Sequence, residues 1–287
     1  MEPKIILSHR DPEPENSVLY MVGTPIGNLD DISARAIKIL DRVSLIACED
    51  TRQTQKIINR FNISNKLICL NKHNSYKKIP TLINFLKSGK SIALVSDAGM
   101  PGICDPGEDV VKAVKAEGFD VICIPGPCAA ITALVTSGMP SSRFVFLGFL
   151  QRKKSDREKI LLEISRNEKT TIIYESPHRL NKLLKELFEV CGGEREIHVT
   201  RELTKKFEEH IGDNICKVIN FFEKRDIIGE ITLVIKGISS NKNKDVDISN
   251  LKFELNELIS AGLSLSAASK YLAKKKGIRK SIIYNLN

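Results

Sequence analysis

The chain has 287 residues, 42% hydrophobic and 28% charged, which is enough for two domains with apolar cores and excludes a disordered chain. Its formal net charge of +9 favours a polyanionic partner, either nucleic acid or an anionic membrane, although a solvated lysine-rich surface is the alternative. The seven cysteines form no CxxC pair, so neither a zinc site nor a redox motif is indicated. Scattered, unpaired cysteines are typical of a cytoplasmic protein, which is the location we expect.

We expect neither a signal peptide nor a membrane span, because of the composition of two segments. Residues 1–16 are rich in charged residues and proline and lack an apolar core. The longest uncharged stretch, 121–142, contains prolines and glycines that would break a membrane helix. We interpret it as a buried strand, a turn and a helix, so no membrane partner is expected.

Five short apolar runs, separated by segments with helical periodicity, predict a parallel sheet in an N-terminal α/β domain over residues 17–138. The runs are 19–22, 45–48, 67–70, 92–95 and 121–124. Each is rich in Val, Ile and Leu and ends in a polar or Gly/Pro turn, as buried parallel strands do. The tetrad Asp105-Pro106-Gly107-Glu108 predicts a helix with Asp105 as its N-cap.

A second α/β domain with a mixed sheet is expected over residues 139–238. Residues 170–174, 196–200 and 230–236 predict strands. Between the first two lies an amphipathic helix that begins at Ser176-Pro177 and ends before Gly192-Gly193. The order of these strands is left open.

A polar linker at residues 239–247 and a small helical tail to residue 287 complete the prediction. After Glu257 the tail has no acidic residue. The basic residues after Glu257 are Lys270, Lys274, Lys275, Lys276, Arg279 and Lys280. Charge of one sign on a small helical unit favours contact with nucleic-acid phosphates, and a solubilising end is the alternative.

Polar, Gly and Pro residues follow all five predicted strands of the first domain. They occupy 23–28, 49–52, 72–74, 96–102 and 125–130. Ligands of open α/β sheets bind outside the carboxyl ends of the strands, so these turns predict a binding cleft. A dinucleotide site is disfavoured because Pro25 and Asn28 replace two required glycines. The five histidines show no metal-ligand spacing, and no metal is expected.

Seven motifs occur in order along the chain. They are Gly23-Thr24-Pro25-Ile26-Gly27-Asn28-Leu29, Glu49-Asp50-Thr51-Arg52, Ser96-Asp97-Ala98-Gly99-Met100-Pro101-Gly102, Ile124-Pro125-Gly126-Pro127, Glu175-Ser176-Pro177-His178-Arg179, Arg201-Glu202-Leu203-Thr204-Lys205 and Gly229-Glu230. Together they resemble the tetrapyrrole-methylase superfamily, and within it the branch that 2'-O-methylates a cytidine of small-subunit (16S) ribosomal RNA. The resemblance implies a two-domain fold that holds S-adenosylmethionine between the domains, usually in a homodimer.

The resemblance also implies roles for residues of the matched motifs. The cofactor would be bound by Gly23, Pro25, Ile26, Asp97, Gly99, Pro101, Gly102, Cys128, Ala129, Glu175, Ser176, Glu202, Gly229 and Glu230. Substrate contacts are expected from Asp50, Arg52, His73 and Arg179, and catalytic roles from Glu49, Arg201 and Lys205. Cys128 departs from the serine that relatives often carry. The general base is not assigned, and a structural salt bridge is the alternative role for each arginine.

Two other functions compete with ribosomal RNA methylation. A methyltransferase for a tetrapyrrole precursor is the first, because the wider superfamily contains such enzymes, but the basic tail and Glu49–Arg52 disfavour it. The second is a non-catalytic RNA-binding or assembly protein, which the complete set of cofactor turns disfavours. The acceptor, the dimer interface and the choice between free RNA and an assembled small subunit stay open.

Overall fold

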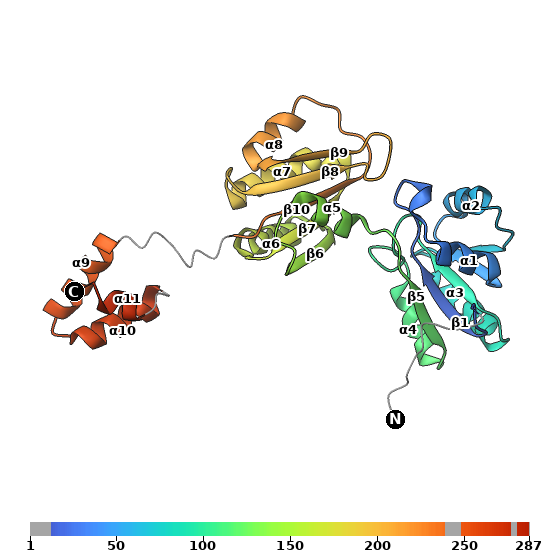
Figure 1. Cartoon of the computed structure of the whole chain (residues 1–287), viewed down its shortest axis with the longest axis horizontal. Helices are drawn as coiled ribbons and strands as arrows, with labels where there is room; N and C mark the ends of the chain where they lie inside the picture. Colours follow the sequence, from blue (N-terminus) through green and yellow to red (C-terminus); the bar gives the residue numbers. More distant parts are fainter. Residues whose placement is uncertain (1–12, 239–247, 277–279, 287) are drawn as a thin grey trace. The chain divides into compact units, whose positions relative to one another are not determined.

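The computed structural model describes residues 13–238, 248–276 and 280–286 (Figure 1). The chain divides into two compact units, residues 1–238 and 239–287. The linker expected at 239–247 lies outside the described residues, as do Arg279 and the side chains of Lys274, Lys275 and Lys276.

The first sheet consists of five parallel strands in the order β3-β2-β4-β1-β5. They are β1 (Val18–Val22), β2 (Leu45–Cys48), β3 (Leu67–Cys69), β4 (Ile92–Val95) and β5 (Asp120–Ile124). All five predicted strands are confirmed, each with boundaries within one residue. Alternate side chains face opposite sides of the sheet, so Tyr20 belongs to one apolar core and Leu19 and Met21 to the other.

Helices cover both faces of this sheet, which buries its strands on both sides. A short 3₁₀ turn, Leu29–Asp31, precedes α1 (Ala34–Arg42), and α2 (Thr51–Arg60), α3 (Ser75–Lys87), α4 (Glu108–Ala116) and α5 (Ala129–Ser137) follow. Helices α1 and α2 pack in one core, and α3 and α4 in the other.

The predicted start of α4 was wrong. The helix begins at Glu108, directly after Gly107, and Asp105 is not its N-cap. Two residues with left-handed backbone, Gly102 (φ +86°) and Cys104 (φ +66°), turn the chain before the helix. Gly107 takes the N-cap position without a side-chain cap, although the local sequence has the composition of one.

The second sheet has the order β6-β7-β10-β8-β9, and only its β6–β7 pair is parallel. Its strands are β6 (Phe144–Phe149), β7 (Thr170–Glu175), β8 (Glu196–Arg201), β9 (Glu209–Asn214) and β10 (Ile231–Ile235). The predicted mixed sheet and its three predicted strands are confirmed. Strands β6 and β9 were not predicted.

The two faces of the second sheet have different covers. Helices α6 (Lys154–Arg166), α7 (Pro177–Cys191) and α8 (Ile215–Phe222) pack on one face. On the other face, Ala133 and Leu134 of α5 pack against Ile172 and Val234. Because α5 follows the first sheet and packs on the second, it connects the two halves of this unit. Helix α7 begins after Ser176 and ends before Gly192, as predicted, whereas α6 and α8 were not predicted.

The second unit contains three helices among its described residues, α9 (Ile248–Ser260), α10 (Leu265–Lys276) and α11 (Lys280–Tyr284). Leu255, Ala268, Leu272 and Ile283 form its small apolar core. The predicted helical tail is thereby confirmed. Across the described ranges of the chain, no helix combines the length and the apolar character that crossing a membrane requires.

Candidate functional site

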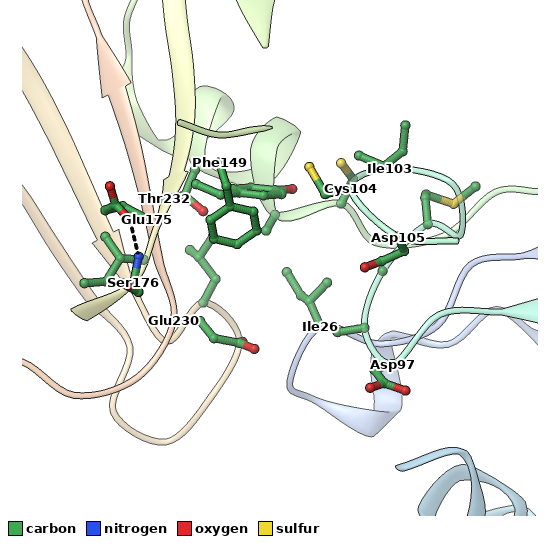
Figure 2. A pocket seen from close by; sticks show the side chains of 18 of the residues that line it. Ile26, Asp97, Ile103, Cys104, Asp105, Phe149, Glu175, Ser176, Glu230 and Thr232 are labelled. Carbon is green, nitrogen blue, oxygen red and sulfur yellow. Dashed lines mark hydrogen bonds between the residues drawn. The ribbon is translucent and has the colours of Figure 1, made fainter. Parts of the chain in front are cut away.

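A cleft of about 410 Å³ lies between the two sheets of the first unit (Figure 2). Its size is within the range of small-molecule sites. The predicted site residues that line it are Ile26, Glu49, Asp97, Gly99, Cys128, Ala129, Glu175, Ser176, Gly229 and Glu230. The first six follow strands β1, β2, β4 and β5, so the carboxyl edge of the parallel sheet forms one wall, as the sequence predicted.

Close packing of glycine backbones shapes this wall. A Cβ atom on Gly126 would lie 2.8 Å from the Cα atom of Gly23 and 3.0 Å from its oxygen, so only glycine fits. Thr24, which follows Gly23, forms two backbone hydrogen bonds with Gly99: its N–H donates to the Gly99 carbonyl at 2.9 Å, and its carbonyl accepts the Gly99 N–H at 3.1 Å. Gly23, Pro25, Pro101 and Gly102 do not line the cleft; they belong to the turns that hold its lining residues in place.

Three carboxyl groups lie on this side of the cleft. Asp97 accepts the backbone N–H of Asp50 at 2.9 Å, and partial burial raises its pKa. Burial, followed by the negative charge of Asp97, raises the pKa of Glu49. Burial raises the pKa of Asp105 to about 6, and the charge of Glu49 adds to the effect. The site therefore concentrates negative charge and favours a cationic ligand.

A second, polar hollow adjoins the cleft and shares Glu49 and Asp97 with it. Its other lining residues are Asp50, Thr51, Arg52, Cys69, Asn71, Lys72 and His73. The predicted substrate residues Asp50, Arg52 and His73 are thus brought together. Arg52 is 86% exposed and forms an ion pair with Asp50 at 2.6 Å, which lowers the pKa of Asp50 to about 2.

Arg179 lies elsewhere than the other predicted substrate residues. Its Nε atom forms an ion pair with Glu175 at 3.1 Å, and its Nη2 donates to the carbonyl of Leu150 at 3.0 Å. The Glu175 carboxylate also accepts the N–H of Ser176 at 2.8 Å, as Figure 2 shows. Both side chains therefore hold the turn between β7 and α7, which forms part of the cleft wall.

Arg201, Glu202 and Lys205 are not among the residues that line the cleft. Lys205 donates from Nζ to Glu202 and to Glu230, each at 2.8 Å. Glu202 also accepts the backbone N–H of Glu230 at 2.9 Å, and a Cβ on Gly229 would meet the Glu202 side chain at 2.6 Å. These contacts fix the Gly229-Glu230 turn at the cleft.

Arg201 forms an ion pair with Glu209 at 3.0 Å and donates to the carbonyl of Ile228 at 3.0 Å. It joins strands β8 and β9 to the segment before β10. Arg201 and Arg179 both form salt bridges, which was the alternative role given for each arginine.

Several lining residues were missed from the sequence. They are Ala98, Met100, Ile103, Cys104, Asp105, Phe149, Tyr174, Pro177, Leu203, Ile231 and Thr232. The Tyr174 hydroxyl accepts the N–H of Ala130 at 3.1 Å, and the Phe149 ring packs 5.6 Å from the Tyr174 ring. Their sequence signal is that of ordinary buried strands, which does not separate a cleft wall from a core.

Comparisons with known proteins agree with this architecture. A family model described as Tetrapyrrole (Corrin/Porphyrin) Methylases matches residues 18–216. A protein named ribosomal RNA small subunit methyltransferase I, from Synechocystis sp., is 41% identical over 270 residues, which cover 94% of this chain and 97% of that protein. Other bacterial relatives of similar identity carry the same name.

Solved structures of lower identity share the fold. A cobalt precorrin-4 methyltransferase of cobalamin biosynthesis is 15% identical and superposes with a TM-score of 0.61, covering 77% of this chain and 95% of that chain. A uroporphyrin-III C-methyltransferase from Thermus thermophilus, solved with S-adenosylhomocysteine, is 14% identical with a TM-score of 0.55, covering 75% and 96%.

Proposed function

The chain belongs to the tetrapyrrole methylase family, within it to the branch of ribosomal RNA small subunit methyltransferase I, and we propose that it methylates the 2'-hydroxyl of a cytidine in small-subunit ribosomal RNA. Methyl transfer from S-adenosylmethionine is the activity of the family. The acceptor is the proposed part. The observation that carries it is the polar hollow with Arg52, Lys72 and His73, which opens beside the cleft.

The residues of the cleft fit S-adenosylmethionine. Ile26, Phe149 and Leu203 offer apolar surface to an adenine ring. Asp97 and Asp105 offer negative charge to a ligand whose sulfonium and ammonium outweigh its single carboxylate. When bound, the cofactor supplies a methyl group activated by the sulfonium charge. The residues that we propose to hold it are those that line the cleft, with Gly23, Pro25, Pro101, Gly102 and Glu202 acting through the turns.

The polar hollow fits one nucleotide of an RNA strand. Arg52 and Lys72 are cations beside an opening, and Arg52 in particular can bind a phosphate through two parallel hydrogen bonds. Asn71 and His73 add donors and acceptors for a base or a ribose. Glu49 lies where hollow and cleft meet, so we propose that it contacts the ribose. We propose that Arg201 and Lys205 act by positioning the Gly229-Glu230 turn.

The assembly and the domain limits complete the proposal. We propose that residues 17–138 and 139–238 are the two halves of the transferase and that the enzyme acts as a homodimer. An acceptor in ribosomal RNA would place its action in the cytoplasm. Sedimentation equilibrium of the purified protein measures the oligomeric state, and a monomer at micromolar concentration would contradict the homodimer.

The decisive experiment is methyl transfer from labelled S-adenosylmethionine to small ribosomal subunits that lack the modification. We expect label on a cytidine ribose, located by nuclease digestion and mass spectrometry. A parallel reaction offers uroporphyrin III, the acceptor that the name of the Thermus thermophilus neighbour gives. Label on the tetrapyrrole and none on RNA would replace the proposed acceptor, and RNA binding without any transfer would indicate a non-catalytic protein.

The basic tail gives a separate prediction about RNA affinity. Replacing Lys270, Lys274, Lys275 and Lys276 with glutamine removes four positive charges. If they contact phosphates, the slope of log affinity against log salt should fall by up to about 3, measured by filter binding to the small subunit. The control is Lys154, Lys159, Lys182 and Lys185 changed to glutamine, which removes the same charge from α6 and α7. Equal slopes for both variants would contradict a phosphate-contacting role.

A further inference from the structure

Asp105 is a carboxyl group of the cleft that no motif identified. It lies in the turn after β4, and its carboxylate points into the cleft (Figure 2). Gly102 and Cys104, which precede Asp105 in this turn, have left-handed backbone conformations. A non-glycine residue such as Cys104 adopts positive φ at a cost in energy, so the surrounding structure holds this turn against an unfavourable conformation.

The surroundings of Asp105 join the cleft to the polar hollow. Glu49, at the end of β2, and Asp97, at the end of β4, place negative charge near it, and Lys72 after β3 places positive charge. Lys72 donates from Nζ to the carbonyl of Cys104 at 2.9 Å. Ser96 contributes a hydrogen bond to the carboxylate. Lys72, which lines the hollow, thus also holds the turn that contains Asp105.

Most other carboxylates near the cleft already have strong partners. Asp97 accepts the backbone N–H of Asp50, and Glu202 and Glu230 both bind Lys205. The Glu175 side chain is fully buried between two arginines. A carboxylate whose oxygens already accept hydrogen bonds from such partners offers fewer free positions to a substrate hydroxyl. Glu49 and Asp105 are the remaining candidates.

We propose that Asp105 is the general base that accepts the proton of the acceptor hydroxyl. The inference rests on the proposed ribose acceptor. The 2'-oxygen forms its bond to the methyl carbon while the carbon–sulfur bond breaks, the electron pair of that bond stays on sulfur, and the hydroxyl proton passes to the Asp105 carboxylate. The sulfonium charge is thereby neutralised, and the acid form of Asp105 later returns its proton to water.

Two features favour Asp105 over Glu49. Asp105 lines the cleft that would hold the methyl donor, on a turn that Lys72 of the hollow contacts, whereas Glu49 lines the hollow itself and is the hydrogen-bond partner proposed for binding the ribose. In addition, the pKa of Asp105 is raised to about 6, first by burial and then by the charge of Glu49. A base with a pKa just below the working pH is ionised yet still accepts a proton readily.

Asp105→Asn tests the proposal directly. The amide keeps the shape of the side chain but does not accept a proton. We expect the single-turnover rate at saturating RNA and cofactor to fall by a factor of about 100 or more, while affinity for the small subunit stays within about threefold. Asp105→Glu should restore part of the rate. An unchanged single-turnover rate in Asp105→Asn would overturn the proposal. If Glu49→Gln loses the rate while Asp105→Asn keeps it, Glu49 is the base instead.

The pH dependence supplies a signature that a structural role would not produce. The ionised carboxylate is the active form, so the wild-type rate should rise with pH through a midpoint near pH 6 and then level off. Lys72 lowers the pKa of Asp105, so Lys72→Met should move the midpoint to higher pH. A midpoint that does not move, or one that persists in the residual rate of Asp105→Asn, would count against Asp105.

A measurement on the wild-type protein without turnover keeps the two proposals separate. The carboxyl carbon of ¹³C-labelled aspartate, assigned by comparison with Asp105→Asn, should titrate near pH 6. A titration near the ordinary value of about 4 would overturn the assignment of the base even if RNA is methylated. Absence of RNA label in the wild type would instead overturn the proposed acceptor, and the base with it.

The variant is expected to fold. The folded pKa of Asp105 lies above its unfolded value, so the folded state binds the proton more tightly. The contribution of Asp105 to the free energy of unfolding therefore decreases as the pH rises from about 4 to about 6. Asp105→Asn should not show this decrease, because the amide does not titrate. Urea denaturation at pH 7 should give a midpoint for Asp105→Asn at or above that of the wild type.

Discussion

Gly126→Ala should weaken binding of S-adenosylhomocysteine by a factor of about 100, which corresponds to about 3 kcal/mol. The added Cβ would lie 2.8 to 3.0 Å from backbone atoms of Gly23, and backbone, unlike the end of a flexible side chain, does not move aside cheaply. The turns after β1 and β5 would have to separate. Thr24, next to Gly23, is hydrogen-bonded to Gly99 of the cleft wall, so the displacement passes to the ligand site.

Gly118→Ala is the matched control for this substitution. No heavy atom lies within 4 Å of the position of its added Cβ, and its φ of +82° makes alanine strained there. It precedes β5, at the end of the strand opposite the cleft. We expect it to lower stability by about 1 kcal/mol but to leave ligand affinity unchanged in isothermal titration calorimetry. Wild-type affinity in Gly126→Ala would contradict the role of the glycine contact.

The first sheet could be predicted from the sequence because burial on both faces makes its strands continuous apolar runs. Leu45–Cys48 and Ile92–Val95 are completely buried, and their predicted and observed limits are the same. Strand β9 has no such signal. Its sequence, Glu-His-Ile-Gly-Asp-Asn, is polar because it forms the edge of the second sheet, and its pairing with β8 comes from tertiary structure.

Asp105 marks the limit of local reasoning about the site. Asp-Pro-Gly-Glu has the composition of a helix start, and the pattern alone cannot distinguish a cap from a side chain directed into a cleft. Cys104, directly before Asp105, has a positive φ, which the sequence does not reveal. Tyr174 was missed for a related reason, since an aromatic residue of a strand has the same signal in a core and in a cleft wall, whereas Phe149 lies in β6, which was not predicted.

The close contact between two glycine turns is easier to anticipate from the sequence than the partners of the arginines. Glycine positions report the local backbone, and Gly23 and Gly126 are required by their mutual contact. The function of an arginine depends instead on which carboxylate its long side chain reaches. Arg201 reaches Glu209, eight residues along the chain on the neighbouring strand, and Arg179 reaches Glu175. Such pairings need distances that only the folded structure supplies.

A buried ion-pair network behind the cleft should control the stability of the second sheet. Arg157 of α6 is 5% exposed. It forms ion pairs with Glu186 of α7 at 2.6 Å and with Glu175 at 3.5 Å. Glu175 has a fully buried side chain at the end of β7 and lines the cleft. The guanidinium therefore compensates two carboxylates and ties α6 and α7 to the wall of the ligand site.

Arg157→Met should lower the free energy of unfolding by about 3 to 5 kcal/mol, because it leaves Glu175 and Glu186 with less compensation for their burial. Lys154→Met on the same helix is the control. Its pair with Glu158 spans 3.8 Å between side chains that are 87% and 57% exposed, and should contribute less than about 0.5 kcal/mol. Urea denaturation measures both. If Arg157→Met costs less than about 1 kcal/mol, Glu175 does not depend on Arg157. Adding Glu186→Gln should recover part of a larger loss, since it removes one of the two carboxylates that lose Arg157 as a partner.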